Sequence, residues 1–293
     1  MYPSTFGAII GLVLGSGLMA AEPREDVKPG EPQWKLGLQA WTYNRFTLFE
    51  TIDKAKALGI RYLEAYPGQA LSPADKSVKF DVGSPAEVRD QVKKKLKEAG
   101  VKLVNFGVVD VGEDEKSARR VFEFAKDMGI ETIVAEPKPA VLDALDKLTQ
   151  EYKINLAIHD HPKPSPYWDP QFVLKAVKGR NKRMGACADT GHWVRSGLDP
   201  VECLKQLEGR IISLHFKDLN EKKKDAHDVP WGTGISNIEG QLAELKRQGF
   251  SGVFAIEYEH DEDNPTPGVS KCVEAFNRFT RQLGVKLASA EPK

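Results

Sequence analysis

Short apolar runs alternate with longer amphipathic segments along most of this chain. Eight of the runs are rich in small, aromatic or β-branched residues and have the length of buried strands. We predict strands at residues 36–43, 62–67, 103–109, 132–136, 155–161, 184–189, 211–218 and 253–259. Because a loop and a helix-length segment follow the runs, the strands are expected to be parallel and joined by helical crossovers.

The segments between the strands carry the signals of helices. Amphipathic stretches occupy residues 47–59, 84–100, 114–129, 238–249 and 271–284. Several end on a glycine, which suits the left-handed cap of a helix: Gly59, Gly100, Gly129 and Gly249. Eight strand and helix units close a barrel of roughly 250 residues. The pattern therefore predicts an α/β protein made of a single (β/α)8 TIM barrel, spanning residues 34–286.

Polar residues recur near the carboxyl end of every predicted strand. In the stretch 184–218, which we interpret as strand, helix and strand, Ser213, His215 and Lys217 share one face because side chains alternate. Placing the aliphatic set of each strand outward leaves these residues facing inward: Gln39, Trp41, Tyr43, Glu64, Asn105, Glu136, His159, His161, Asp189, His215, Lys217 and Glu257. A barrel of this kind builds its site at the mouth where the carboxyl ends of its strands meet, so we expect these side chains there.

Four of the inward residues form a candidate metal site. His159, Asp189, His215 and Glu257 come from four strands that follow one another among the eight, and together they offer two imidazoles and two carboxylates. This mixture suits one divalent ion of the Mn, Zn, Co or Mg type. Each residue alone could instead brace the barrel, but the set of four favours a metal.

Other inward residues are candidates for contact with a substrate. His192 follows the strand that ends at Asp189, and it either holds a substrate hydroxyl or packs within its loop. Lys217 either polarises a substrate carbonyl or forms an internal ion pair with Glu257 or Asp189. His161 is a candidate proton carrier. Glu64 is expected to contact the substrate from the second strand.

Tryptophans mark the same mouth. Trp231 precedes Gly232 and Gly234, so a tight loop is expected to place its ring over a sugar. This GTG lacks the strand and helix context of a nucleotide-binding loop. Trp41 also lies in a predicted mouth segment, as do Trp168 and Trp193. Core packing explains any one of them, whereas several at one rim favour a carbohydrate.

The net charge and the N-terminal residues indicate which binding partners and which cellular location to expect. The 42 basic and 42 acidic residues cancel, which argues against nucleic acid and favours a neutral small molecule. Residues 1–21 have no charged side chain and are apolar after residue 5, which predicts a signal peptide followed by a linker at 22–33. We therefore expect export to the periplasm or to the extracellular space, with no stable membrane span after the signal peptide is cleaved. An uncleaved anchor is the alternative. Residues 287–293 are expected to be a flexible tail, and assembly into a homo-oligomer is left open.

Several short motifs, taken in their order along the chain, resemble those of a known protein family. The pieces QAWTY, GIRYLEAYP, LAIHDHP, DTGHW, SLHFKD, WGTG and GFSGVFAIEYE follow one another between Trp34 and about Gly284. In this order they resemble the xylose isomerase-like TIM barrel superfamily of sugar isomerases and epimerases, the sugar phosphate isomerase/epimerase family. The resemblance implies a divalent metal at the barrel mouth and a ketose or keto-sugar bound to it.

The resemblance also implies roles for individual residues. The aspartate, histidine and last glutamate that bind the family's metal fall on Asp189, His215 and Glu257, and its substrate-contacting histidine falls on His192. The family's fifth-strand ligand is usually glutamate, whereas this chain has His159 there. Only Glu257 therefore remains of the pair of glutamates that epimerases use on opposite sides of the substrate carbon.

Two enzymatic hypotheses follow. The first is a sugar isomerase or epimerase that moves a proton through an enediolate, with Glu257, His161 and Glu136 as catalytic candidates. The second is a lyase or hydrolase that cleaves a 3-keto-glycoside at the same site. A barrel that binds carbohydrate without turnover is a weaker alternative. The apurinic-site endonuclease of the superfamily needs histidines on early strands, whereas all six histidines here lie from His159 onward.

Overall fold

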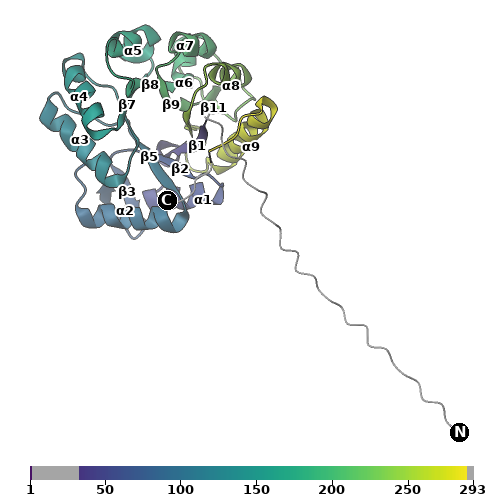
Figure 1. Cartoon of the computed structure of the whole chain (residues 1–293). Coiled ribbons are helices and arrows are strands. Elements are labelled where there is room, and N and C mark those ends of the chain that lie inside the picture. Colours follow the sequence, from purple (N-terminus) through teal and green to yellow (C-terminus); the bar gives the residue numbers. More distant parts are fainter. Residues whose placement is uncertain (2–32, 289–293) are drawn as a thin grey trace. The chain divides into compact units, whose positions relative to one another are not determined.

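A closed barrel of eight parallel strands forms the centre of the molecule (Figure 1). The computed structural model describes Met1 and residues 33–288. Around the barrel the strands follow the order β1, β12, β9, β8, β7, β6, β5 and β2. Their bounds are β1 Trp34–Gln39, β2 Tyr62–Ala65, β5 Lys102–Phe106, β6 Thr132–Ala135, β7 Asn155–His159, β8 Met184–Asp189, β9 Ile211–Phe216 and β12 Gly252–Ile256. All eight predicted strands and the (β/α)8 TIM barrel are confirmed.

Helices surround the barrel (Figure 1). The α-helices are α1 Leu48–Ala57, α2 Ala86–Ala99, α3 Glu115–Met128, α4 Leu142–Tyr152, α5 Pro170–Val177, α6 Thr190–Arg195, α7 Pro200–Gln206, α8 Ile238–Arg247 and α9 Thr266–Leu283. Short 3-10 helices occupy η1 Ala40–Tyr43, η2 Pro139–Val141 and η3 Pro166–Trp168. Gly100 and Gly129 end α2 and α3 with φ of 66° and 70°, which is the left-handed cap expected from the sequence.

The predicted boundaries differ from the structure at several places. The first strand ends at Gln39, because the Gln39 side chain accepts a hydrogen bond from Trp41 N and caps η1. The single helix expected between β8 and β9 is two helices. Asp189 caps α6 and Asp199 caps α7, with Gly197 between them at a φ of +85°.

Two small antiparallel hairpins were not expected from the sequence. One consists of β3 (Gln69–Ser72) and β4 (Asp75–Phe80), and it follows β2. The other pairs β10 (Asp218–Leu219) with β11 (Asp228–Val229) after β9. Both are insertions at the carboxyl ends of barrel strands, where the loops of this fold form its site.

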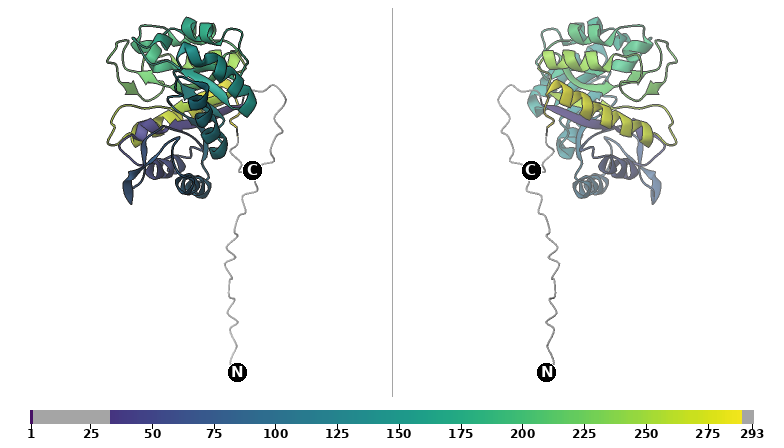
Figure 2. Two further views of the ribbon diagram at one scale, coloured as in Figure 1. Left: turned by 90° about the vertical axis from the view of Figure 1, so that its left-hand side faces the viewer. Right: turned by 90° about the vertical axis from the view of Figure 1, so that its right-hand side faces the viewer.

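The apolar faces of the strands pack against the helices. Helix α9 lies beside β1 in Figure 2, and the rings of Trp34 and Phe276 are 6.1 Å apart. Phe254 of β12 lies between them at 4.8 Å from Trp34 and 5.2 Å from Phe276. All three side chains are fully buried. This packing leaves the inward face of the barrel to the polar residues.

The ends of the described region bear on the expected domain limits. The predicted signal peptide (1–21), apart from Met1, and the linker (22–33), apart from Gln33, lie outside the described residues, so export stays a prediction. Leu287 pairs with Trp34, and Ala288 N donates to Trp34 O at 2.9 Å, so the barrel's contacts extend two residues into the predicted tail. Residues 289–293 lie outside the described region. Within residues 33–288, no helix is long and apolar enough to span a bilayer.

Candidate metal centre and substrate cavity

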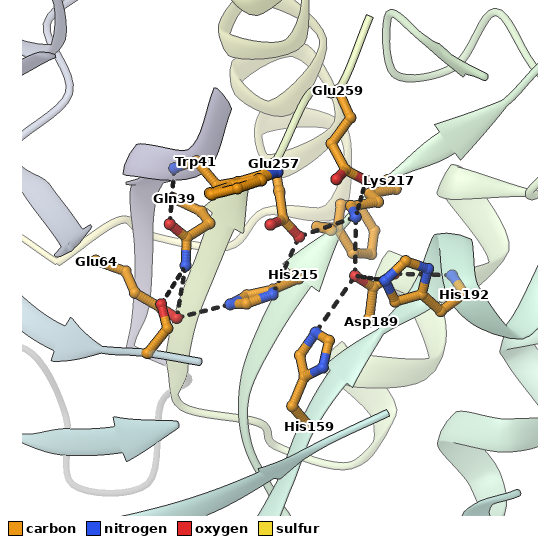
Figure 3. Close-up of polar contacts among 12 residues, drawn as sticks. Gln39, Trp41, Glu64, His159, Asp189, His192, His215, Lys217, Glu257 and Glu259 are labelled. Carbon is orange, nitrogen blue, oxygen red and sulfur yellow. Dashed lines mark hydrogen bonds and ion pairs between the residues drawn. The ribbon is translucent and has the colours of Figure 1, made fainter. Parts of the chain in front are cut away.

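Four buried side chains converge at the mouth of the barrel (Figure 3). They are His159 at the end of β7, Asp189 at the end of β8, His215 of β9 and Glu257 just after β12. One donor atom from each lies within 4.8 Å of the others. These are the four metal ligands expected from the sequence, and β7, β8, β9 and β12 are consecutive around the barrel.

The four donor atoms lie close together without hydrogen bonds of good geometry. His159 Nε2, Asp189 Oδ2, His215 Nδ1 and Glu257 Oε2 are buried, and their close polar contacts are ionic ones with one another, with Lys217 and with His192. A buried polar atom without a hydrogen bond costs about 1–3 kcal/mol, so a shared ligand at this point would stabilise the set. Two nitrogens and two carboxylate oxygens match the preferences of a divalent ion such as zinc, manganese or cobalt. The residues present therefore fit a metal.

Glu64 fixes the orientation of His215. Its carboxylate accepts hydrogen bonds from Gln39 Nε2 at 2.9 Å and from Asn105 Nδ2 at 3.0 Å. His215 Nε2 lies 2.7 Å from Glu64 Oε1. Since these contacts leave the carboxylate as an acceptor, His215 Nε2 donates to it. His215 Nδ1 faces Glu257 Oε2, 3.1 Å away, and is the nitrogen that would bind a metal. Glu64 is fully buried and does not line the cavity, so the structure places it behind His215 rather than at the expected substrate contact.

Glu64→Gln is expected to lower the affinity for a divalent metal about 10–100-fold, because the carboxylate that orients His215 is lost. The measurement is the dissociation constant of Co²⁺ or Zn²⁺ by competition with a chelator, together with the melting temperature. Glu131→Gln is a matched control, since Glu131 pairs with Lys35 and Lys102 at a partly exposed position. Equal metal affinity in both variants and in the parent protein would contradict the orienting role.

Lys217 holds the acidic side of the site together. Its Nζ lies 3.0 Å from Asp189 Oδ2, 2.9 Å from Glu257 Oε2 and 2.7 Å from Glu259 Oε2. Only 1% of Lys217 is exposed, and three carboxylates match its three donors. Of the two roles left open by the sequence, the structure shows the internal ion pair, and Lys217 does not reach the cavity.

His192 and Asp189 are linked through helix α6. Asp189 Oδ1 accepts from His192 N at 2.8 Å, and His192 Nε2 lies 3.5 Å from Asp189 Oδ2. Arg195 Nη1 donates to His192 Nδ1 at 3.2 Å, because an arginine can only donate. Burial would raise the pKa of Asp189, but neighbouring His192 and Lys217 hold it well below its usual range. Asp189 is therefore ionised near neutral pH and suited to a cation.

His161 and Glu136 form a dyad at the rim. Glu136 Oε1 lies 2.8 Å from His161 Nδ1 and accepts from His161 N at 2.7 Å. Although burial opposes it, contacts with His159 and His161 hold the pKa of Glu136 well below its usual value. An ionised Glu136 makes Nδ1 the donor and leaves His161 Nε2 available to take or give a proton. Glu136 thus acts through His161 as a positioning residue.

A cavity of about 460 Å³ adjoins these residues. It is lined by His159, His161, His192 and Glu257, as expected, and by Trp41, which is 44% exposed. The structure also brings Gln39, Tyr66, Pro67, Gly107, Val108 and Glu259 to its wall. The volume lies within the range of about 300–1,000 Å³ typical of small-molecule sites.

Trp231, which the sequence predicts over a bound sugar, does not line this cavity. Its Nε1 donates to Phe216 O at 3.1 Å, and its ring packs edge-on against Phe216 at 4.9 Å. Phe216 points to the outer, aliphatic side of β9, so Trp231 is part of the core there and only 3% exposed. Trp193 is likewise buried, at 1% exposed.

Sequence reasoning missed two residues that shape the site. Glu259 lines the cavity and binds Lys217, and alternation from Glu257 would have placed it on the same face. Arg195 contacts Glu259 at 3.4 Å and Asp228 at 3.2 Å. Its spacing of three residues from His192 on a helix was the available signal.

Comparisons with known proteins agree with the barrel fold. A family model described as xylose isomerase-like TIM barrel matches residues 52–279. Inosose dehydratase from Bacillus cereus (strain AH820) is 26% identical over 136 residues, which cover 41% of this chain and 45% of that protein. The match thus spans under half the length of this relative.

Two solved structures extend the comparison. An uncharacterised protein from Parabacteroides distasonis ATCC 8503 is 35% identical with a TM-score of 0.68, over 84% of this chain and 98% of that chain. The structure of the IolI protein with a bound zinc atom has a TM-score of 0.65 and 18% identity, over 85% of this chain and 98% of that chain. At that identity the second likeness concerns the fold alone.

Proposed function

Because the chain belongs to the xylose isomerase-like TIM barrel family, we propose that it is a divalent-metal-dependent enzyme that removes a proton beside the carbonyl of a ketose or keto-sugar. The observation that carries the proposal is the convergence of four buried donor atoms, on His159, Asp189, His215 and Glu257, within 4.8 Å of one another. They adjoin a cavity of sugar size, which has an exposed aromatic ring, Trp41, in its wall.

A bound metal supplies Lewis acidity, which polarises a substrate carbonyl and acidifies the neighbouring C–H. The chain's own residues then handle the proton. Glu257 lines the cavity and offers a carboxylate as general base. His161 Nε2, held by the contact of Nδ1 with Glu136, is placed to return a proton. Return to carbon through an enediolate gives isomerisation or epimerisation.

A second outcome, elimination or hydrolysis of a 3-keto-glycoside, is favoured by the asymmetry of the site. His159 takes the place of a second glutamate, so the two proton carriers facing the cavity include one carboxylate, Glu257, and one imidazole, His161. A protonated imidazole can donate its proton to the oxygen of a leaving group as well as to a substrate carbon. The partial match to inosose dehydratase supports this second outcome.

Solvent exchange tests the proposal. The metal-loaded protein is incubated in D₂O with a panel of ketoses and 3-keto-glycosides, and deuterium at the carbon beside the carbonyl is followed by NMR. Exchange with a recovered or isomerised sugar supports isomerase or epimerase chemistry, and loss of water or aglycone supports elimination. If the metal-bound protein causes neither deuterium exchange nor elimination with any compound of the panel, the proposal is refuted.

A further inference from the structure

A second cavity of about 540 Å³ lies at the same mouth of the barrel. Its wall comes from the segments that follow β2, β4 and β5, together with the first turns of α3. The polar residues that line it are Asp81, Asp110, Ser117 and Arg120. Its volume also falls in the range of about 300–1,000 Å³ expected for a small-molecule site.

The two cavities adjoin. Pro67 lines both, and the consecutive residues Val108 and Val109 line one each. Tyr66 and Trp41, whose rings meet edge-on at 5.0 Å, stand in the wall of the first cavity next to Pro67. A ligand that extends past these rings from the metal donors enters the second cavity.

The charges around the second cavity select the kind of group it can hold. Arg120 is exposed, and its side chain makes no hydrogen bond or ion pair with any other residue in the part of the chain that is described. Its guanidinium is therefore free to donate to a ligand, while the carboxylates of Asp81 and Asp110 can accept from hydroxyl groups. One cation beside two carboxylates disfavours a phosphate or carboxylate ligand and suits an uncharged polyol.

The first cavity points the same way. Glu257 and Glu259 line it, and no lysine or arginine of residues 33–288 does so, because Lys217 and Arg195 are engaged with buried carboxylates. Across both cavities four carboxylates face the ligand with Arg120 as the one permanent cation among the described lining residues. A phosphorylated sugar would lack the cationic partners that phosphate recognition requires.

We propose that the substrate is an uncharged two-unit saccharide or glycoside, with its keto-sugar unit in the metal-side cavity and a second hydroxyl-bearing unit in the cavity of Arg120. The placement of the keto unit rests on the proposed function. The placement of the second unit rests on the adjoining cavities and their charges alone. Arg120 is the specificity residue that recognises the second unit.

Binding to the full-length, metal-loaded protein tests this directly. Isothermal titration compares D-glucose with the neutral disaccharides cellobiose and maltose, and with an aldobiouronic acid whose uronate is an anionic counterpart. The neutral disaccharides are expected to bind at least about tenfold more tightly than glucose, since a hydrogen bond to a charged group is worth roughly that factor. The uronate compound is expected to bind more weakly than the neutral disaccharides.

Two variants locate the effect. Arg120→Ala is expected to lower disaccharide affinity about tenfold and leave glucose affinity unchanged. Gly83→Phe inserts a ring where a Cβ meets nothing within 4 Å, and it is expected to remove the preference for disaccharides by filling the cavity. Arg119→Ala is the matched control, because Arg119 pairs with Glu115 and Glu151 and lines neither cavity.

The outcomes separate the two proposals. If no tested disaccharide binds more tightly than glucose, or if both variants match the control, the second subsite is refuted even when deuterium exchange occurs. If the disaccharide preference depends on Arg120 but no proton exchange is found, the subsite stands and the proposed chemistry fails.

Discussion

Asp189→Asn is expected to abolish metal binding and to lower turnover about a thousandfold, since several kcal/mol of charge stabilisation are lost and each ~1.4 kcal/mol is a factor of ten. Asp189 supplies an anionic oxygen among the four donors, and its pKa is held low, so the neutral amide cannot replace it. Asparagine keeps the cap of α6, because its side-chain oxygen can still accept from His192 N. The measurements are metal content by mass spectrometry and the turnover rate on the sugar that reacts in the exchange screen.

Asp199→Asn is the matched control for this variant. Asp199 caps α7 by accepting from Val201 N and Glu202 N, so the same substitution changes charge and cap in the same way outside the site. It is expected to keep full metal content and turnover. Wild-type metal content in Asp189→Asn, with folding shown by circular dichroism, would remove Asp189 from the metal site.

His161→Gln is expected to lower turnover by about 10²–10⁴-fold while metal content stays unchanged, because proton transfer by a positioned group contributes that much. His161 lies at the cavity rim and is held by Glu136, yet it is not among the four convergent donors. The loss is therefore expected in kcat rather than in metal affinity. This separates a proton carrier from a ligand.

His227→Gln provides the comparison, since His227 is exposed, stacks on His260 and lines neither cavity. It is expected to leave kcat unchanged. If His161→Gln and His227→Gln have equal kcat values, the proton passes through another group, and Glu257 alone becomes the candidate carrier.

Much of the fold and the metal centre could be predicted from alternation along the strands. Apolar outward faces identified all eight strands, and the polar inward residues at their ends included every one of the four donors. This works because a barrel strand has two distinct environments, and a shift by one residue would bury the polar set against the helices.

Alternation does not predict depth within the mouth. Glu64 and Lys217 face inward as expected, yet they lie below the cavity, where partners of opposite charge or hydrogen-bonding character enclose them. The position of Trp231 could not be predicted for a different reason. Trp231 lies in a loop, where alternation along a strand does not fix the direction of a side chain, and its ring packs against Phe216.

The order of the strands places the donors and the second cavity on different halves of the barrel. The four donors lie at or just after the ends of β7, β8, β9 and β12, which are contiguous, whereas the second cavity is built after β2 and β5 on the other side of the ring. Substitutions in the hairpin or loops of the second half therefore leave the strands that carry the donors unchanged. Under the proposed function, variation of those loops would change which saccharide binds while the proton-transfer residues stay in place.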